Sequence, residues 1–186
     1  MLINAIDPKQ LITKDMKPII VLLIVCPILI SDCANHTSKE KETDFEDKIN
    51  NLVLSENKIG QEYFFKVSSK DVLEYKIKYL GSMSSAGKEL KFLNSTVITG
   101  LYEDSKRASC TVNIYDQHNN IIGFYYVGGT LDAPDSIEGY NLVFNYNNDR
   151  CNQKTSISFK DSIPNKIFVA CTKDGGDIYS FNRDVN

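Results

Sequence analysis

Apolar and polar positions alternate with a period of two along most of the chain from residue 61 to residue 181. Between residues 73 and 79, leucine, tyrosine and isoleucine alternate with glutamate and lysine. This alternation is typical of a β-strand with one buried and one solvated face. The same pattern, or a short aromatic and β-branched run, predicts strands at 63–67, 73–79, 90–99 (one long strand or two short ones), 109–115, 121–127, 140–146, 156–159, 166–172 and 178–181.

Turn-forming residues separate these segments. Asn, Asp, Gly and Pro gather at 116–120, 147–149, 164–165 and 174–177, and the small-residue segment 81–87 is predicted to be a loop. No helical pattern long enough for a parallel crossover lies between the predicted strands. The expected fold is therefore mainly β: an antiparallel β-sandwich or a curved, barrel-like sheet of about six to nine strands, with one short N-terminal helix.

The helical pattern precedes the strands. Thr43 and Glu46 have the spacing of a capping box, and Phe45, Ile49, Leu52 and Val53 follow at helical intervals. We expect Thr43 to be the N-cap of a helix over about 44–55.

Ahead of this helix lies an uncharged run. Lys17 is followed by the thirteen residues 18–30, which carry no charge, and then by Ser31, Asp32 and Cys33. A basic start, a short apolar run and a small-residue exit are the features of an export signal. The run is shorter than the roughly 20 residues of a membrane-spanning helix, and Pro27 would interrupt such a helix.

Residues 16–33 resemble the signal peptide of bacterial lipoproteins. The box before the cysteine is Ile30-Ser31-Asp32-Cys33, in which Asp32 stands where that family has Gly, Ala or Ser. The resemblance implies cleavage before Cys33, acylation of Cys33 and, since Ala34 follows, the outer membrane of the cell envelope as destination. The anchored domain would then face the periplasm or the cell surface.

The expected organisation has three parts. Residues 1–32 form the export signal. Its first part, 1–15, carries Asp7 and Asp15, whereas a signal should start short and basic, so we interpret 1–15 as an over-long gene start. Residues 33–43 form a flexible polar tether, and 44–186 form a single β-rich domain. The net charge is −3 and no basic run is present, which argues against nucleic acid as a partner. The expected membrane contact is the lipid anchor.

Few residues have the spacing of catalytic chemistry. The sequence has two histidines, of which His118 lies beside Asp116 in a predicted turn, so neither a histidine-based catalytic site nor a zinc site is expected. The acidic segment 132–139 lacks the spacing of a calcium loop and is interpreted as a solvated loop. We expect no enzyme activity, metal or cofactor.

Cysteines and tyrosines give the remaining candidate residues. Cys151 and Cys171 flank a predicted hairpin and are the favoured disulfide, which leaves Cys110 as a buried, inert thiol. The alternative that all three are reduced core residues stays open. Tyr125, Tyr126, Tyr140 and Tyr146 are a possible recognition surface or, alternatively, ordinary strand residues.

These observations favour a lipid-anchored envelope protein that acts as a binding or inhibitory, immunity-like module for another envelope or secreted protein. Two alternatives stay open. One is a lipocalin-like carrier of a small apolar ligand, and the other is an envelope hydrolase that uses carboxylates.

Overall fold

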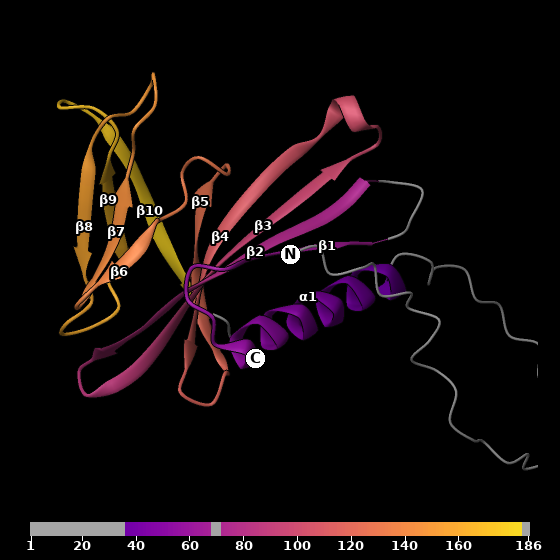
Figure 1. Ribbon diagram of the computed structural model, residues 1–186, viewed down its shortest axis with the longest axis horizontal. Helices are drawn as coiled ribbons and strands as arrows, with labels where there is room; N and C mark the ends of the chain where they lie inside the picture. Colours follow the sequence, from indigo (N-terminus) through magenta and orange to yellow (C-terminus); the bar gives the residue numbers. More distant parts are fainter. Residues whose placement is uncertain (1–35, 68–71, 184–186) are drawn as a thin grey trace, which may run out of the picture.

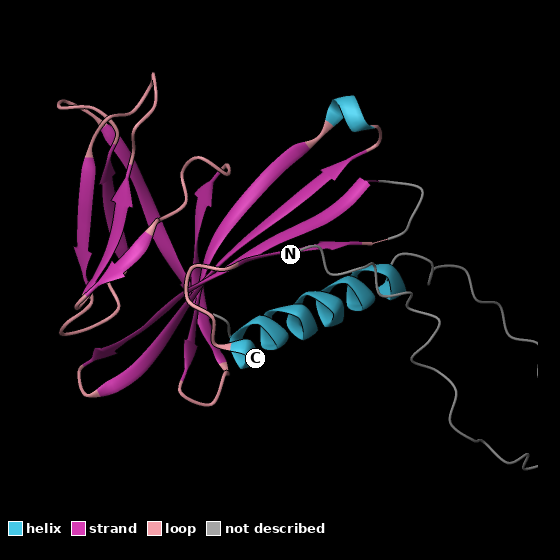
Figure 2. Ribbon diagram, viewed as in Figure 1, coloured by secondary structure: helices cyan, strands magenta, loops and turns pink. Residues whose placement is uncertain are grey.

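The computed structural model describes residues 36–67 and 72–183. One α-helix precedes ten described strands, and a short 3₁₀ turn joins two of them (Figures 1 and 2). The elements are α1 (His36–Glu56), β1 (Glu62–Lys66), β2 (Val72–Ser85), β3 (Lys88–Gly100), η2 (Glu103–Ser105), β4 (Arg107–Asp116), β5 (Ile121–Gly128), β6 (Ser136–Glu138), β7 (Asn141–Asn145), β8 (Lys154–Ser158), β9 (Lys166–Ala170) and β10 (Gly176–Arg183).

The strands form two sheets. Seven strands follow the order β1-β2-β3-β4-β5-β10-β9, and β6-β7-β8 form a small second sheet. Each described strand pair is antiparallel. The prediction of a mainly β, antiparallel fold with one helix is confirmed, although the described strands number ten rather than about six to nine.

The large sheet is covered on both faces. The small sheet packs on one face, which we call the inner face, and α1 packs on the opposite or outer face (Figure 1). Between the two sheets, the ring of Phe159 contacts Phe92 at 5.1 Å and Tyr125 at 6.3 Å between centroids, both edge to face. Under the helix, Ile49 and Val53 pack on buried strand residues that include Tyr75, Ile77 and Leu93.

The helix differs from its prediction at its start. It begins at His36 rather than after Thr43, because the Lys and Glu residues of 39–42 are themselves good helix formers. Its end at Glu56 agrees with the prediction, and Asn57 follows with a positive φ of 51° that suits a helix C-terminus. Leu52, expected in the apolar stripe, is substantially exposed.

The predicted loop at 81–87 is wrong. Strand β2 continues to Ser85 and only Ala86 and Gly87 form the turn, both with positive φ, as a two-residue type I′ hairpin turn requires. A bulge between Tyr79 and Gly81 shifts the register, after which Met83 is buried in the core between the sheets. Small residues in a strand therefore looked like a loop in the sequence. The predicted loop at 132–139 likewise contains strand β6.

The predicted disulfide between Cys151 and Cys171 is present, but the predicted hairpin between these cysteines is wrong: β8 and β9 belong to different sheets, and the disulfide joins the two sheets. Cys151 precedes β8 and Cys171 follows β9, and their Cα atoms are 4.3 Å apart. Two hydrogen bonds reinforce the junction: Asn152 N donates to Cys171 O at 2.9 Å, and Ala170 N donates to Thr155 Oγ1 at 3.0 Å. Cys110 is a buried free thiol, as expected, and burial raises its pKa.

The export signal and Cys33 lie outside the described residues. In the part of the chain that the structure describes, no helix has both the length and the apolar character needed to cross a membrane.

Candidate functional site

Helix α1 leaves part of the outer face uncovered. The cluster beneath it draws on β1 to β4 and on Ile121 at the start of β5, whereas the rest of β5, β10 and β9 continue the sheet beyond it. On these three strands, Tyr125, Val127, Tyr179, Ile167 and Val169 point into the core between the sheets. Because side chains alternate along a strand, their neighbours Tyr126, Ile178 and Phe168 point to the outer face.

Phe168 and Ile178 form an exposed apolar pair, which we call the outer patch, and Tyr126 is exposed on the same face of β5. Tyr126 is 51% exposed, Phe168 52% and Ile178 66%. Ile178 lies directly opposite Phe168 across the β9–β10 pair. The other outer-face positions of β9 and β10 are Lys166, Ala170, Gly176, Ser180 and Asn182. Among these five residues, Lys166 alone carries a charge. A sheet face with aromatic residues and few charges has the composition of the centre of a protein interface.

The predicted recognition tyrosines do not share one surface. Tyr126 is exposed on the outer face of β5, and Tyr140 is exposed beside the β6–β7 turn of the other sheet. Tyr125 and Tyr146 are buried, so for these two residues the prediction of a recognition surface is wrong. Their hydroxyls donate to the carbonyl oxygens of Pro164 and Asp132 respectively. On β5, strand alternation places the neighbours Tyr125 and Tyr126 on opposite faces.

Burial further disfavours ionisation of the core tyrosines, whose hydroxyls are already neutral at pH 7 at their ordinary pKa. It raises the pKa of Tyr179 to about 12 and also raises the pKa values of Tyr125 and Tyr146. These phenols therefore remain protonated at neutral pH, and they serve as hydrogen-bonding core residues rather than as bases.

Phe168 and Ile178 were not identified from the sequence. The segment Ile167-Phe-Val169 is apolar at successive positions, whereas a half-exposed strand should alternate. That uninterrupted run signals a strand with two apolar faces. One face fills the core, and the other is the outer patch.

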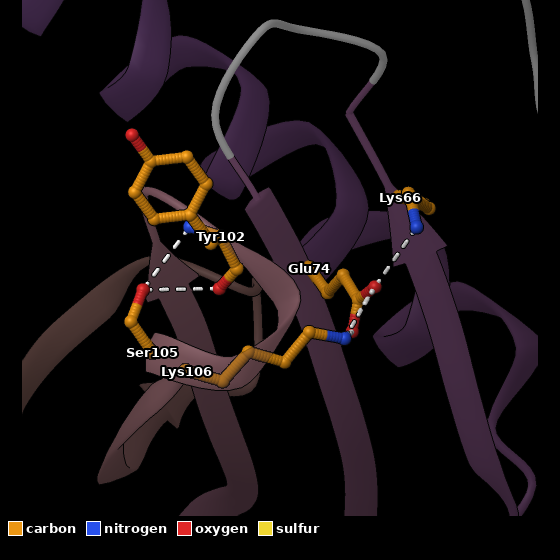
Figure 3. Close-up of polar contacts among 5 residues, drawn as sticks. All are labelled: Lys66, Glu74, Tyr102, Ser105 and Lys106. Carbon is orange, nitrogen blue, oxygen red and sulfur yellow. Dashed lines mark hydrogen bonds and ion pairs between the residues drawn. The ribbon is translucent and has the colours of Figure 1, made fainter.

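A polar cluster lies on the inner face (Figure 3), at the end of the large sheet that is farthest from the small sheet (Figure 1). Glu74 accepts from Lys66 at 3.1 Å and from Lys106 at 3.3 Å, thereby linking β1, β2 and the start of β4. The hydrogen bond from Lys66 is the largest cause of a lowered Glu74 pKa. Ser105 Oγ accepts from Tyr102 N and donates to Tyr102 O, each at 3.0 Å, which closes the β3–β4 turn. These contacts stabilise the end of the sheet.

The remaining sequence candidates have structural roles. Asp116 accepts from the backbone amides of His118 and Asn120, so it closes the β4–β5 turn. Asp132 accepts from Gly129 N, and Asp135 accepts from Asn145 N. Among the described residues, no three or more His, Cys, Asp or Glu side chains lie together so that they could hold a metal ion.

Comparison with known proteins found no matching family model, no matching curated protein and no matching solved structure.

Proposed function

We propose that the chain is an exported cell-envelope protein whose β domain binds another exported or envelope protein through the outer patch. The carrying observation is the division of the outer face. Helix α1 covers one half, while the other half exposes Phe168 and Ile178 on the paired strands β9 and β10, and Tyr126 on β5. Large, rigid apolar side chains lose little conformational entropy on binding, so a patch of this kind favours protein association.

The position of the patch supports this function. Residues 167 and 169 of β9 are buried in the core, so Phe168 between them is held on a fixed backbone. The disulfide at the end of β9 ties the same strand to the second sheet. A module that binds by this face would act by occupying its partner's surface, which is the mode of an inhibitor or immunity-type protein.

The proposed location rests on the cysteine chemistry and on the signal-like segment. A disulfide between Cys151 and Cys171 is consistent with an oxidising compartment outside the cytosol. In this proposal Cys33 carries the lipid anchor in the outer membrane. The helix His36–Glu56 would then begin close to the bilayer, with the β domain beyond it.

The two alternative functions gain no comparable support. A carrier needs an apolar cavity, whereas Phe159 packs edge to face against Phe92 and Tyr125 across the space between the sheets. A carboxylate hydrolase needs carboxylates that are available for catalysis. Asp132 and Asp135 instead accept hydrogen bonds from the backbone amides of Gly129 and Asn145, which is a structural role.

The binding proposal is tested by affinity capture from envelope extracts, followed by binding measurements with each purified candidate. Ile178→Asp places a charge in the outer patch, and Leu131→Asp makes the same change at an exposed leucine in the β5–β6 connection. We expect Ile178→Asp to weaken binding at least about tenfold, because the buried charge would have no counter-ion, and Leu131→Asp to leave it unchanged. Equal binding by both variants, or loss only on Tyr140→Asp, would contradict the role of the patch.

The anchor is tested separately by mass spectrometry and fractionation. We expect the mature chain to begin at Cys33 with attached acyl chains, and Cys33→Ser to leave the membrane fraction because its apolar anchor is missing. Unprocessed chain in the cytosol would rule out this location, whatever the binding result.

A further inference from the structure

Strand β1 is an edge of the large sheet. It pairs with β2 on one side, and no described strand pairs with its other side. Val67 N donates to Leu73 O, which places odd-numbered residues of this segment in the hydrogen-bonded positions toward β2. In an antiparallel ladder the intervening residues direct their backbone groups the other way. The N–H and C=O groups of Glu62, Phe64 and Lys66 therefore point outward from the sheet edge.

The sequence of β1, Glu62-Tyr-Phe-Phe-Lys66, is complementary to itself in antiparallel orientation. When two copies pair about Phe64, Glu62 of each copy lies opposite Lys66 of the other, and the two Phe64 residues lie opposite each other. Opposite charges and aromatic pairs at facing positions stabilise a sheet. In this register the paired residues are the same ones whose backbone groups point outward.

Neighbouring charges on β2 extend the complementarity. Lys78 lies beside Glu62, and Glu74 lies beside Lys66, all on the inner face. Across the junction the order would be Lys78, Glu62, then Lys66 and Glu74 of the second copy, with the signs alternating throughout. The central row is aromatic: Phe64 is 61% exposed and Lys76 Nζ lies 5.8 Å from its ring centroid.

Edge strands that avoid self-association commonly carry charged side chains. When all these charges have the same sign, the edge strand repels the same strand of a second copy. Strand β1 instead has a carboxylate at one end and an ammonium group at the other, so a second copy in antiparallel orientation is attracted at both ends. We propose that this protein forms a two-fold symmetric homodimer in which the β1 strands pair antiparallel, joining the two large sheets into one.

The symmetry suits the rest of the fold. A two-fold axis through the paired Phe64 residues, perpendicular to the sheet, leaves both inner faces on one side and both α1 helices on the other. Strand β9 is at the opposite end of the sheet from β1. The outer patch would therefore remain exposed in the dimer, and the dimer does not depend on the proposed binding function.

Two charge variants test the register. Glu62→Lys and Lys66→Glu each replace the attractive facing pairs by repulsive ones, whereas an equimolar mixture restores attraction at both ends. We expect the full chain to dimerise in sedimentation velocity experiments in mild detergent. For each variant alone, the dissociation constant of the dimer should rise about tenfold or more. The mixture should form a heterodimer. Lys166→Glu, at the β9 edge, is the matched control and should dimerise like the unmodified chain.

Circular dichroism of each variant checks that the sheet is intact. A monomeric unmodified chain throughout the concentration series would overturn the proposal, as would variants that dimerise unchanged. Folded variants that fail to associate when mixed would exclude this register.

Discussion

At the scale of single residues, Gly123 determines how closely two strands approach. It lies opposite Ile114 on β4 and Arg183 on β10, with a φ of 155°. A Cβ atom at this position would lie 2.6 Å from Phe181 Cζ and would also meet the carbonyl oxygen of Asn182. We expect Gly123→Ala to lower the free energy of unfolding by about 3 kcal/mol, through backbone strain and overpacking together.

Gly139 provides the matched comparison in urea unfolding experiments. Its φ is also positive, at 62°, but a Cβ atom there would meet no atom within 4 Å. Gly139→Ala should therefore cost only the conformational strain, about 1 kcal/mol. Equal losses in the two variants would show that the approach of β10 to β5 does not depend on the missing side chain.

At the scale of elements, alternation in the sequence was sufficient to predict most of the strands. It placed strands at 73–79, 109–115 and 121–127, and β2, β4 and β5 contain them. Alternation failed where a strand lacks large side chains. The second half of β2 holds Gly81 and three serines, and its burial depends on a bulge and on packing against the second sheet. Such long-range contacts leave no local signature.

The same limits apply to the candidate site. Tyr126 could be predicted as a recognition residue because it is an aromatic residue on a strand, but Phe168 and Ile178 come to lie on the same sheet face only through the order β5-β10-β9. Strand order depends on pairing between segments distant in sequence. By contrast, the charge pattern of β1 is visible in the sequence, and it acquires a meaning once β1 is known to be an edge.

At the scale of the whole molecule, the two sheets are held together by their shared core and by one covalent link. The disulfide closes a segment with a sequence separation of 20 that includes β8 and β9, which belong to different sheets. In the chain-entropy description, closing a loop of this length stabilises the folded state by about 3 kcal/mol. We expect reduction, or Cys151→Ser with Cys171→Ser, to lower the free energy of unfolding in urea by about that amount.

The loss of stability on removing the disulfide should be larger in the small sheet than in the large one. Strands β6, β7 and β8 pair only with one another among the described strands, so amide hydrogen exchange should accelerate there more than in β2, β3 and β4. The double serine variant should be insensitive to reductant. Cys110→Ala should retain the full response, because the Cys110 thiol is buried apart from the disulfide. Uniform acceleration across both sheets would mean that they unfold as one unit, and that the disulfide stabilises the molecule without holding the second sheet in particular.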